Sequence, residues 1–348
     1  MKTRELLYSL PEGAIAGRPA PGRDEARLLV VGEHGFSHRV VRELPELVPA
    51  GALVVLNDTR VRRARLIGRR RPGGGKVELL LLRRLGEGGK SVRFEALGRA
   101  SRPLTPGTAV DAGPLEAVVL ARGAGGLLEV EVRGERNAEA ELERSAHVPI
   151  PPYLRREDDA DDVERYQTVY ARHMGSVAAP TAGLHLTAAL LEQLRRRAEL
   201  GALTLHVGAG TFRPVTTEHV EHHPMHAEEL VVSDALVRDV ARARSRGAPI
   251  VAVGTTVVRG LESAADPERP GQVRPFSGTT ELLIQPGHRF HVVDALLTNF
   301  HQPRSTLLAL VAAFAGLERV RAAYALALAE GYRFLSYGDA MWIPRRHA

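Results

Sequence analysis

KVELLLLRRLGEGGKSVRFEAL, residues 76–97, holds two apolar runs separated by a glycine-rich turn, and neither run has a helical period. The runs LEAVVLA at 115–121 and LLEVEV at 127–132 follow the same pattern, and turns that contain Gly, Pro and Asp separate them. Short strands joined by such turns are typical of antiparallel sheets. The segment from Lys76 to about Val132 therefore predicts a small antiparallel β-barrel or sandwich.

The segments on either side of this β domain have a different character. Before it, GALVVL at 51–56 is typical of a buried strand, and the basic stretch Arg60–Lys76 follows Asn57 and Asp58. After it, PIPPYLRREDDADDVE at 149–164 joins a proline cluster to a run of acids, which predicts an exposed linker.

Beyond this acidic segment the pattern alternates between helix and strand, which is typical of an α/β domain. Thr187 and Ser233 are expected to cap helices, and Gly201 is expected to end the first of them. The predicted elements are helices at 190–200, 233–247, 303–316 and 318–330, and strands at 202–207, 249–253, 281–285, 290–299 and 333–343.

The composition limits the class of protein. The chain has 348 residues, of which 44% are hydrophobic and 25% charged, so we expect a folded protein of two domains. The net charge is +6 and nearly all basic residues are arginine, which favours a polyanionic partner. The absence of cysteine excludes disulfides, thiolate nucleophiles and cysteine-ligated metal sites. The sequence shows neither a signal peptide nor a membrane-spanning run, so we expect a cytoplasmic protein that does not enter membranes.

Four motifs place polar residues at predicted strand ends, where α/β proteins bind ligands. They are LHVGAGTFRP at 205–214, VGTTVVRGLES at 253–263, TNFHQPRSTL at 298–307 and SYGDAM at 336–341. The threonines after Gly254 open a helix, so its first N–H groups are suited to an anion or a ribose. A helix cap or a turn explains such motifs equally well, because Thr, Asn and Asp commonly serve there.

EHVEHHPMHAEE at 218–229 concentrates histidines and glutamates, the ligand types that zinc prefers. Pro224 interrupts any helix that would align them, and the spacing matches no zinc-helix motif. The same residues are suited to proton transfer or hydrogen bonding. The basic stretch Arg60–Lys76 is likewise open to two interpretations, a solvated face or a surface that contacts RNA phosphates.

Taken in order along the chain, a series of blocks resembles one family, the S-adenosylmethionine:tRNA ribosyltransferase-isomerases of queuosine biosynthesis. The blocks are LPEGAIA, RLLVV, LNDTRVRRARL, GGKVELLLL, VPIPPY, YQTVYA, SVAAPTAGLHL, LHVGAGTFRPV, MHAEE, VGTTVVRGLES, VVDALLTNFHQPRSTL, AFAG and YRFLSYGDAM. The resemblance implies an α/β fold, with a larger mixed α/β domain and a small inserted antiparallel β-barrel domain. We expect residues 1–60 and 150–348 to form the α/β domain and residues 61–149 to form the barrel.

The resemblance also implies an activity in tRNA modification. Members of this family, which are both transferases and isomerases, move the ribosyl moiety of S-adenosylmethionine onto 7-aminomethyl-7-deazaguanine at the wobble position of tRNA. The products are epoxyqueuosine-tRNA, adenine and methionine. The implied partners are S-adenosylmethionine and tRNA carrying that base. We expect no metal and no cofactor, because S-adenosylmethionine is a co-substrate, and we expect a monomer.

The same resemblance provides hypotheses about site residues. His226, Glu228 and Asp58 are assigned to catalysis, because a carboxylate or an imidazole can remove a proton that the sulfonium acidifies. We expect the substrates to be bound by Arg60, His206, Gly208, Thr211, Thr255, Thr256, Arg259, Glu262, Asn299, His301 and Asp339. Arg62 and Arg63 depart from the Ile-Pro that is common in the family, and they favour contact with phosphate.

Two other functions stay open on the sequence alone. One is a metal-dependent hydrolase that uses the His/Glu cluster at 219–229. The other is a non-catalytic RNA-binding protein that uses the basic stretch and the β domain. The glycine, threonine and histidine blocks at strand ends favour a small-molecule site instead.

Overall fold

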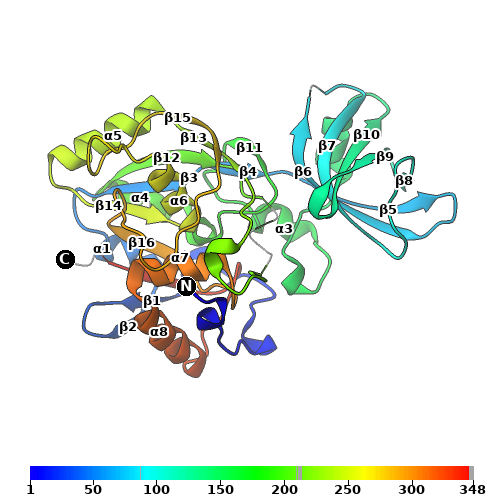
Figure 1. The fold of residues 1–348 in the computed structure, drawn as a ribbon. Helices are drawn as coiled ribbons and strands as arrows, with labels where there is room; N and C mark the ends of the chain where they lie inside the picture. The colour runs from blue at the N-terminus through cyan, green and yellow to red at the C-terminus, as the bar shows by residue number, and fades with distance from the viewer. Residues whose placement is uncertain (87, 209, 211–213, 345–348) are drawn as a thin grey trace.

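The computed structural model describes residues 1–86, 88–208, 210 and 214–344 (Figure 1). Within these residues, nine strands form one mixed sheet. Their order is β15 (Phe276–Thr280), β13 (Glu228–Val232), β12 (Glu199–Leu205), β3 (Leu53–Asn57), β14 (Ile250–Val253), β16 (Ala295–Asn299), β17 (Ala340–Ile343), β1 (Arg27–Val31) and β2 (Phe36–Val40). The central strands β12, β3, β14 and β16 are parallel, whereas β15, β13 and β2 pair antiparallel at the two edges.

Helices cover both faces of the sheet, because alternate side chains of its central strands point to opposite sides. In the predicted strand β3, Leu53 and Val55 pack on one face while Val54 and Leu56 pack on the other. The first face is covered by α5 (Asp234–Ser245), α6 (Thr255–Ser263), α7 (Thr306–Ala315) and α8 (Leu317–Ala329), and the second by α1 (Leu44–Leu47) and α4 (Ala188–Arg195). None of the helices described here combines the length and the apolar character that a membrane span requires.

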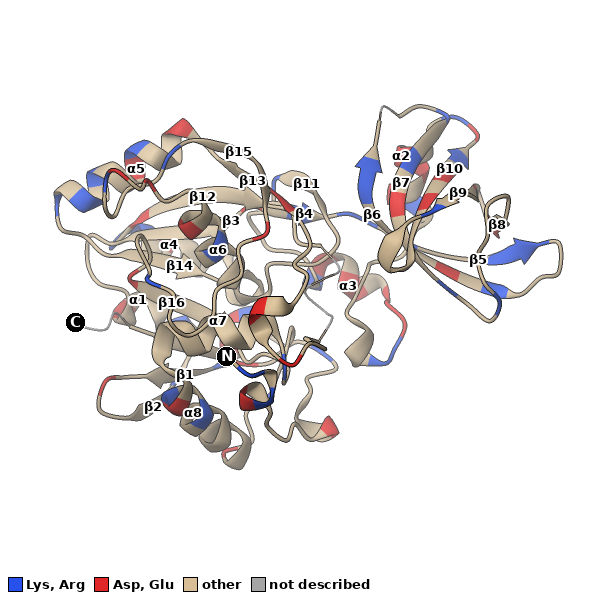
Figure 2. Cartoon of the chain, viewed as in Figure 1, with Lys and Arg blue, Asp and Glu red and all other residues tan. Residues whose placement is uncertain are grey.

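In the same described part of the chain, six strands close into an antiparallel barrel. They are β5 (Arg65–Arg71), β6 (Lys76–Leu85), β7 (Ser91–Ala100), β8 (Ala109–Ala112), β9 (Leu115–Arg122) and β10 (Leu127–Gly134). The alternating residues Val77, Leu79 and Leu81 are buried in its interior. The barrel stands to one side of the sheet, with basic residues along β5 and β6 (Figures 1 and 2). The predicted fold class is confirmed, and the boundaries placed at residues 60 and 150 stay a prediction.

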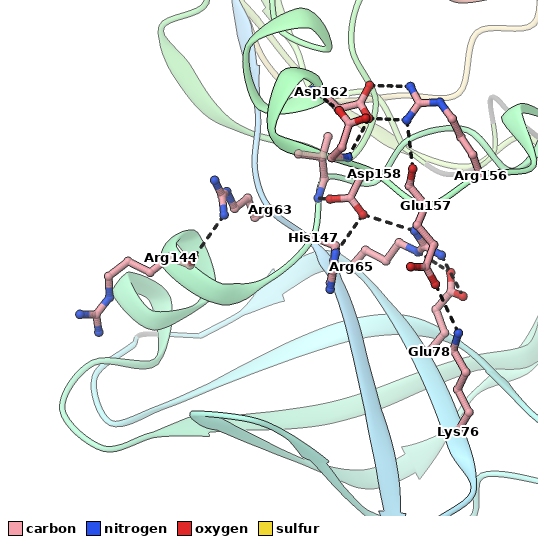
Figure 3. Close-up of polar contacts among 12 residues, drawn as sticks. Arg63, Arg65, Lys76, Glu78, Arg144, His147, Arg156, Glu157, Asp158 and Asp162 are labelled. Carbon is pink, nitrogen blue, oxygen red and sulfur yellow. Dashed lines mark hydrogen bonds and ion pairs between the residues drawn. The ribbon is translucent and has the colours of Figure 1, made fainter. Parts of the chain in front are cut away.

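The chain crosses between sheet and barrel at a junction of short elements. These are β4 (Thr59–Val61), which pairs in parallel with β11 (His173–Ser176), and the helices α2 (Ala138–Ser145) and α3 (Ala160–Arg165). The acidic segment predicted as an exposed linker is largely exposed, but Asp162 is 1% exposed, pairs with Arg156 and accepts a hydrogen bond from the Tyr337 hydroxyl of the body at 2.7 Å. Asp158 accepts a hydrogen bond from His147 Nδ1 at 2.9 Å and lies 3.6 Å from Arg65 Nη1 (Figure 3). The acidic residues of this segment therefore connect the barrel, through Arg65 of β5, to the α/β body.

Two predicted strands are absent or shorter in the structure, because a side chain forms hydrogen bonds with their backbone N–H or C=O groups. Residues 281–285 form no strand, and Arg259 Nε donates to the Leu282 carbonyl at 2.9 Å. The strand predicted at 290–299 begins at Ala295, since the N–H groups of residues 291–293 donate to the Glu262 carboxylate instead.

Two further differences concern the ends of elements. The strand predicted at 333–343 begins at Ala340, because the Arg333 N–H donates to the Asp339 carboxylate at 2.8 Å in the preceding turn. Gly201 lies inside β12 rather than after a helix, and α4 ends at Arg195. A Cβ at Gly201 would lie 2.8 Å from Leu236 Cδ1, so glycine lets α5 approach the sheet closely.

Candidate active site

A cavity of about 820 Å³ lies between the barrel and one edge of the sheet. Its volume is within the range of sites that bind small molecules and cofactors. The barrel side contributes residues of β6, β7 and α2, and the body contributes residues of β11, of β13 and of the segment that follows β12. Four predicted site residues line it: His206, Gly208, His226 and Glu228.

Glu228 provides a buried carboxylate on the wall of this cavity. It begins β13 and is 5% exposed. The Gly208 N–H donates to Glu228 Oε1 at 2.9 Å, and Arg259 Nη1 forms an ion pair with Oε2. Arg259 comes from α6 and lies behind the wall, where it does not line the cavity. Two donors therefore fix the direction of a carboxylate that borders the cavity.

Two imidazoles line the same cavity, and each lies against a glycine. The Thr59 hydroxyl and His206 Nδ1 are 2.7 Å apart, and a Cβ at Gly175 would lie 2.6 Å from His206 Cε1. Burial lowers the pKa of His206, which favours its neutral form. His226 is exposed, and a Cβ at Gly210 would lie 2.5 Å from its Cδ2. Two imidazoles and a carboxylate in the lining of one cavity are suited to proton transfer.

A smaller cavity, of about 60 Å³, lies where β14 and β16 end. It is lined by four residues of the predicted set: Thr255, Thr256, Asn299 and His301. Asn299 Nδ2 lies 3.0 Å from His185 Nε2, whereas Asn299 Oδ1 is buried and has no partner in the described residues. Burial lowers the pKa of His301 to about 3, so this ring stays neutral. Because Val207 lines both cavities, the two are neighbours.

Asp58 and Arg60 lie at the junction and line neither cavity. The Thr204 hydroxyl donates to Asp58 Oδ1 at 2.6 Å, and His173 Nε2 lies 3.6 Å from Oδ2. Arg60 is exposed on β4. The structure therefore does not bring Asp58 together with Glu228 and His226, and it gives the Asp58 carboxylate partners that support a positioning role.

The carboxylates of Glu262 and Asp339 accept hydrogen bonds from backbone N–H groups. Three N–H groups of residues 291–293 donate to Glu262 at 2.9 to 3.0 Å. The N–H groups of Arg27 and Arg333 donate to the two oxygens of Asp339 at 3.0 and 2.8 Å. Both carboxylates are buried and line neither cavity, so they order loops. The predicted Thr211 lies outside the described residues.

Asn57 is a residue of this region that the sequence prediction missed. Its Oδ1 accepts from the N–H groups of Thr59 at 3.2 Å and Leu205 at 3.0 Å. Its Nδ2 donates to the Leu205 carbonyl at 2.9 Å and to Thr256 Oγ1 at 3.3 Å. Asn57 therefore joins β3 to β12 and to the first turn of α6. The available signal was a polar residue directly after a wholly apolar strand.

The His/Glu cluster at 219–229 is dispersed in the structure. Glu221 pairs with the amino group of Met1 at 2.8 Å, while Glu228 is turned toward Gly208 and Arg259. Within the described ranges, no three His, Asp or Glu side chains are grouped so that they could hold a metal ion.

Comparisons with known proteins cover the whole of this architecture. A family model described as queuosine biosynthesis protein matches residues 3–343. The chain is 53% identical to the S-adenosylmethionine:tRNA ribosyltransferase-isomerase of Sorangium cellulosum (strain So ce56), over 99% of this chain and 98% of that protein. It is 51% identical to the protein of the same name from Anaeromyxobacter dehalogenans (strain 2CP-C), over 99% of this chain and 100% of that protein. The crystal structure of S-adenosylmethionine tRNA ribosyltransferase from Thermotoga maritima matches with a TM-score of 0.55 and 34% identity, over 97% of this chain and 99% of that chain.

Proposed function

The chain belongs to the queuosine biosynthesis protein family, and from this membership we propose that it acts as an S-adenosylmethionine:tRNA ribosyltransferase-isomerase. The reaction moves the ribosyl moiety of S-adenosylmethionine onto the aminomethyl group of 7-aminomethyl-7-deazaguanine at the tRNA wobble position. The ribosyl moiety then rearranges to an epoxycyclopentanediol, and adenine and methionine leave. S-adenosylmethionine is consumed as a co-substrate, so the proposal includes no resident cofactor or metal.

The cavity between barrel and sheet is the structural observation that supports this proposal. Its body wall has the buried Glu228 and the imidazole of His206, and its barrel wall has several arginines. A volume of about 820 Å³ is suited to a flipped nucleoside together with S-adenosylmethionine. The reaction needs both substrates in one place, and a cavity of this size at the junction supports the proposal.

We assign proton transfer to Glu228 and His226. Positive sulfur acidifies the protons on the carbon beside it, so an oriented carboxylate or imidazole is a sufficient base. Glu228 is oriented by the Gly208 N–H and by Arg259, and His226 lies at the exposed part of the cavity, where it suits protonation of the departing adenine. Donors near the opening sugar would stabilise the charge that develops on oxygen.

We assign the smaller cavity to polar groups of S-adenosylmethionine. Thr255 and Thr256 present hydroxyl groups at the first turn of α6, and Asn299 Oδ1 is a buried acceptor. Hydroxyl groups of a ribose would satisfy such an acceptor while receiving hydrogen bonds from the helix N-terminus. A Thr256→Ala variant should therefore raise the Kd for S-adenosylmethionine in calorimetry.

The decisive experiment is turnover of purified protein with S-adenosylmethionine and tRNA that bears 7-aminomethyl-7-deazaguanine. Mass spectrometry of digested RNA should show epoxyqueuosine, with free adenine in equal amount. The variants Glu228→Gln and His226→Gln should lower kcat on the order of a hundredfold or more, as expected for a lost proton-transfer group. Glu192→Gln, at an exposed site on α4, is the matched control. Absence of product from folded wild-type protein would overturn the proposal.

The two alternative functions have no support from the comparisons. Zinc analysis of the purified protein tests the hydrolase, and RNA binding measured with and without S-adenosylmethionine tests the non-catalytic reading. A monomeric enzyme that meets its tRNA in the cytoplasm is part of the proposal. Light scattering of the eluted protein measures its oligomeric state directly.

A further inference from the structure

Arg62 and Arg63 stand apart from the other arginines of the cavity because they have no acidic partner. Arg83 pairs with Glu95 at 3.0 Å and Arg84 pairs with Glu139 at 3.2 Å. Among the described residues, neither guanidinium forms an ion pair, although Glu143 lies close by and accepts a hydrogen bond from the Arg63 backbone N–H at 3.3 Å. The cavity therefore contains two guanidinium groups whose charge no ion pair compensates.

The contacts of Arg62 hold its guanidinium in a partly desolvated place. Nη2 donates to the Leu82 carbonyl of β6, and the guanidinium carbon lies 5.0 Å from the centre of the Phe94 ring. Nε is buried without a partner, and Nη1 has none among the described residues. Burial lowers the pKa of Arg62 to about 10, and Glu143 and Glu229 are near enough to oppose this shift without forming an ion pair. A cation in such a place is stabilised when an anion enters the cavity.

Arg63 adds a second donor beside it. Its Nη1 donates to the Arg144 carbonyl of α2 at 3.1 Å, and its other side-chain nitrogens have no partner in the described part of the chain (Figure 3). The other arginines of the basic stretch do not line this cavity. Arg65 pairs with Glu78 at 2.8 Å, Arg71 pairs with Glu116 at 3.0 Å, and Arg69 and Arg70 donate to backbone carbonyls of the barrel.

We propose that Arg62 and Arg63 form a phosphate-binding subsite that holds the tRNA backbone beside the nucleotide whose base enters the cavity. This inference rests on the proposed function, since it assigns the RNA part of the same site. A base that leaves its stack carries its flanking phosphates to the mouth of the pocket. The Arg pair lies on the segment between β4 and β5 and lines the same cavity as Glu228. Planar guanidinium groups match phosphate oxygens in geometry as well as charge.

The test measures RNA binding by fluorescence anisotropy and S-adenosylmethionine binding by calorimetry. The RNA is an anticodon stem-loop with the target base, in which each loop phosphate is replaced in turn by a neutral methylphosphonate. For wild-type protein, one replacement next to the target nucleotide should weaken binding on the order of tenfold or more. For Arg62→Ala with Arg63→Ala, RNA binding should be weaker by a similar factor and no longer sensitive to that replacement. The salt dependence of log K should become shallower by about 0.7 for one phosphate.

Matched variants separate the subsite from general charge and from misfolding. Arg69→Ala with Arg70→Ala removes two charges from the same stretch outside the cavity, and should keep the sensitivity to the methylphosphonate. If the loss of Arg62 disturbs the fold of the junction, Arg63→Ala alone still tests the subsite, because the Arg63 side chain has one backbone contact. Arg62→Lys with Arg63→Lys should recover part of the RNA affinity.

Two results would overturn the inference. One is a double alanine variant that stays sensitive to every phosphate to which the wild type is sensitive. The other is a variant that binds RNA normally and S-adenosylmethionine poorly, because the anion would then be the methionine carboxylate. Turnover of the unmodified substrate by wild-type protein is measured separately, so failure of the subsite is distinguishable from failure of the proposed function.

Discussion

Loss of one partner of the buried pair between Glu228 and Arg259 should destabilise the α/β body. The two side chains are 5% and 7% exposed, so Arg259→Met leaves a carboxylate in the wall with the Gly208 N–H as its remaining donor. Breaking a buried ion pair from one side costs about 3 to 5 kcal/mol. For a chain of 348 residues, this corresponds to a fall in Tm of about 4 to 7 °C, from the usual unfolding entropy per residue.

A double-mutant cycle separates this effect from the loss of packing. The variant with both Arg259→Met and Glu228→Gln contains neither charge, and the amide still accepts from the Gly208 N–H. We expect calorimetry to show that it recovers most of the lost Tm while turnover stays low. If its Tm falls by the sum of the two single effects, the side chains act independently and the ion pair does not orient Glu228.

Three further predictions test the surroundings of the site. Burial lowers the pKa of His301 to about 3 and of His185 to about 4, so the unfolded chain binds more protons below its histidine pKa of about 6.5. The stability that these neutral rings contribute should thus be complete above about pH 6.5, and the free energy of unfolding should fall at lower pH by about 1.4 kcal/mol per pH unit for each histidine. When the free energy of unfolding is measured by urea titration at several pH values, His301→Gln should lose less of it per pH unit than the wild type; an equal loss would contradict this reasoning. Gly175→Ala forces the His206 ring to move, since a Cβ would lie 2.6 Å from Cε1, and should lower kcat about ten- to a hundredfold with little change in Tm; Gly35→Ala, where a Cβ meets nothing within 4 Å, is the control. Asp158→Ala removes the hydrogen-bond acceptor of His147 where the barrel meets the α/β body. It should lower the free energy of unfolding by about 1 to 3 kcal/mol and raise the KM for tRNA more than the KM for S-adenosylmethionine. An equal rise in both KM values would argue that Asp158 does not control the position of the barrel.

The elements that could be predicted are those whose own pattern decides their environment. The run that contains Val77, Leu79 and Leu81 lacks a helical period and is bounded by turn residues, so a strand follows from the sequence, while the structure shows which of its leucines are buried. GALVVL has no polar face, which agrees with its place between two layers of helices. The strands β13 and β15 were not predicted, because strands of five residues contain too little periodic signal.

The cavity could not be predicted in the same way, because its walls come from distant parts of the chain. Its lining combines residues 62–63, 81–84, 139 and 142–143 with residues 174–175, 177, 206–208, 210 and 226–229. Their approach depends on how the barrel sits on the body. That position is held by individual side-chain contacts such as those of Asp158, which no hydrophobic period encodes.

Two glutamates of the candidate set show why residue type and motif do not decide a role. Glu228 and Glu262 are both buried, and both come from blocks that resemble the same family. Glu262 faces a loop whose three consecutive N–H groups have no strand partner, so its oxygens are consumed in ordering that loop. Glu228 starts β13, the second strand from the edge of the sheet, and it lines the cavity between that edge and the barrel. Arg259 and the Gly208 N–H hold it from the protein side, so the carboxylate borders the cavity with its direction fixed. A chemical role therefore requires an oriented group that also faces open space, and that second condition is set by the docking of the barrel.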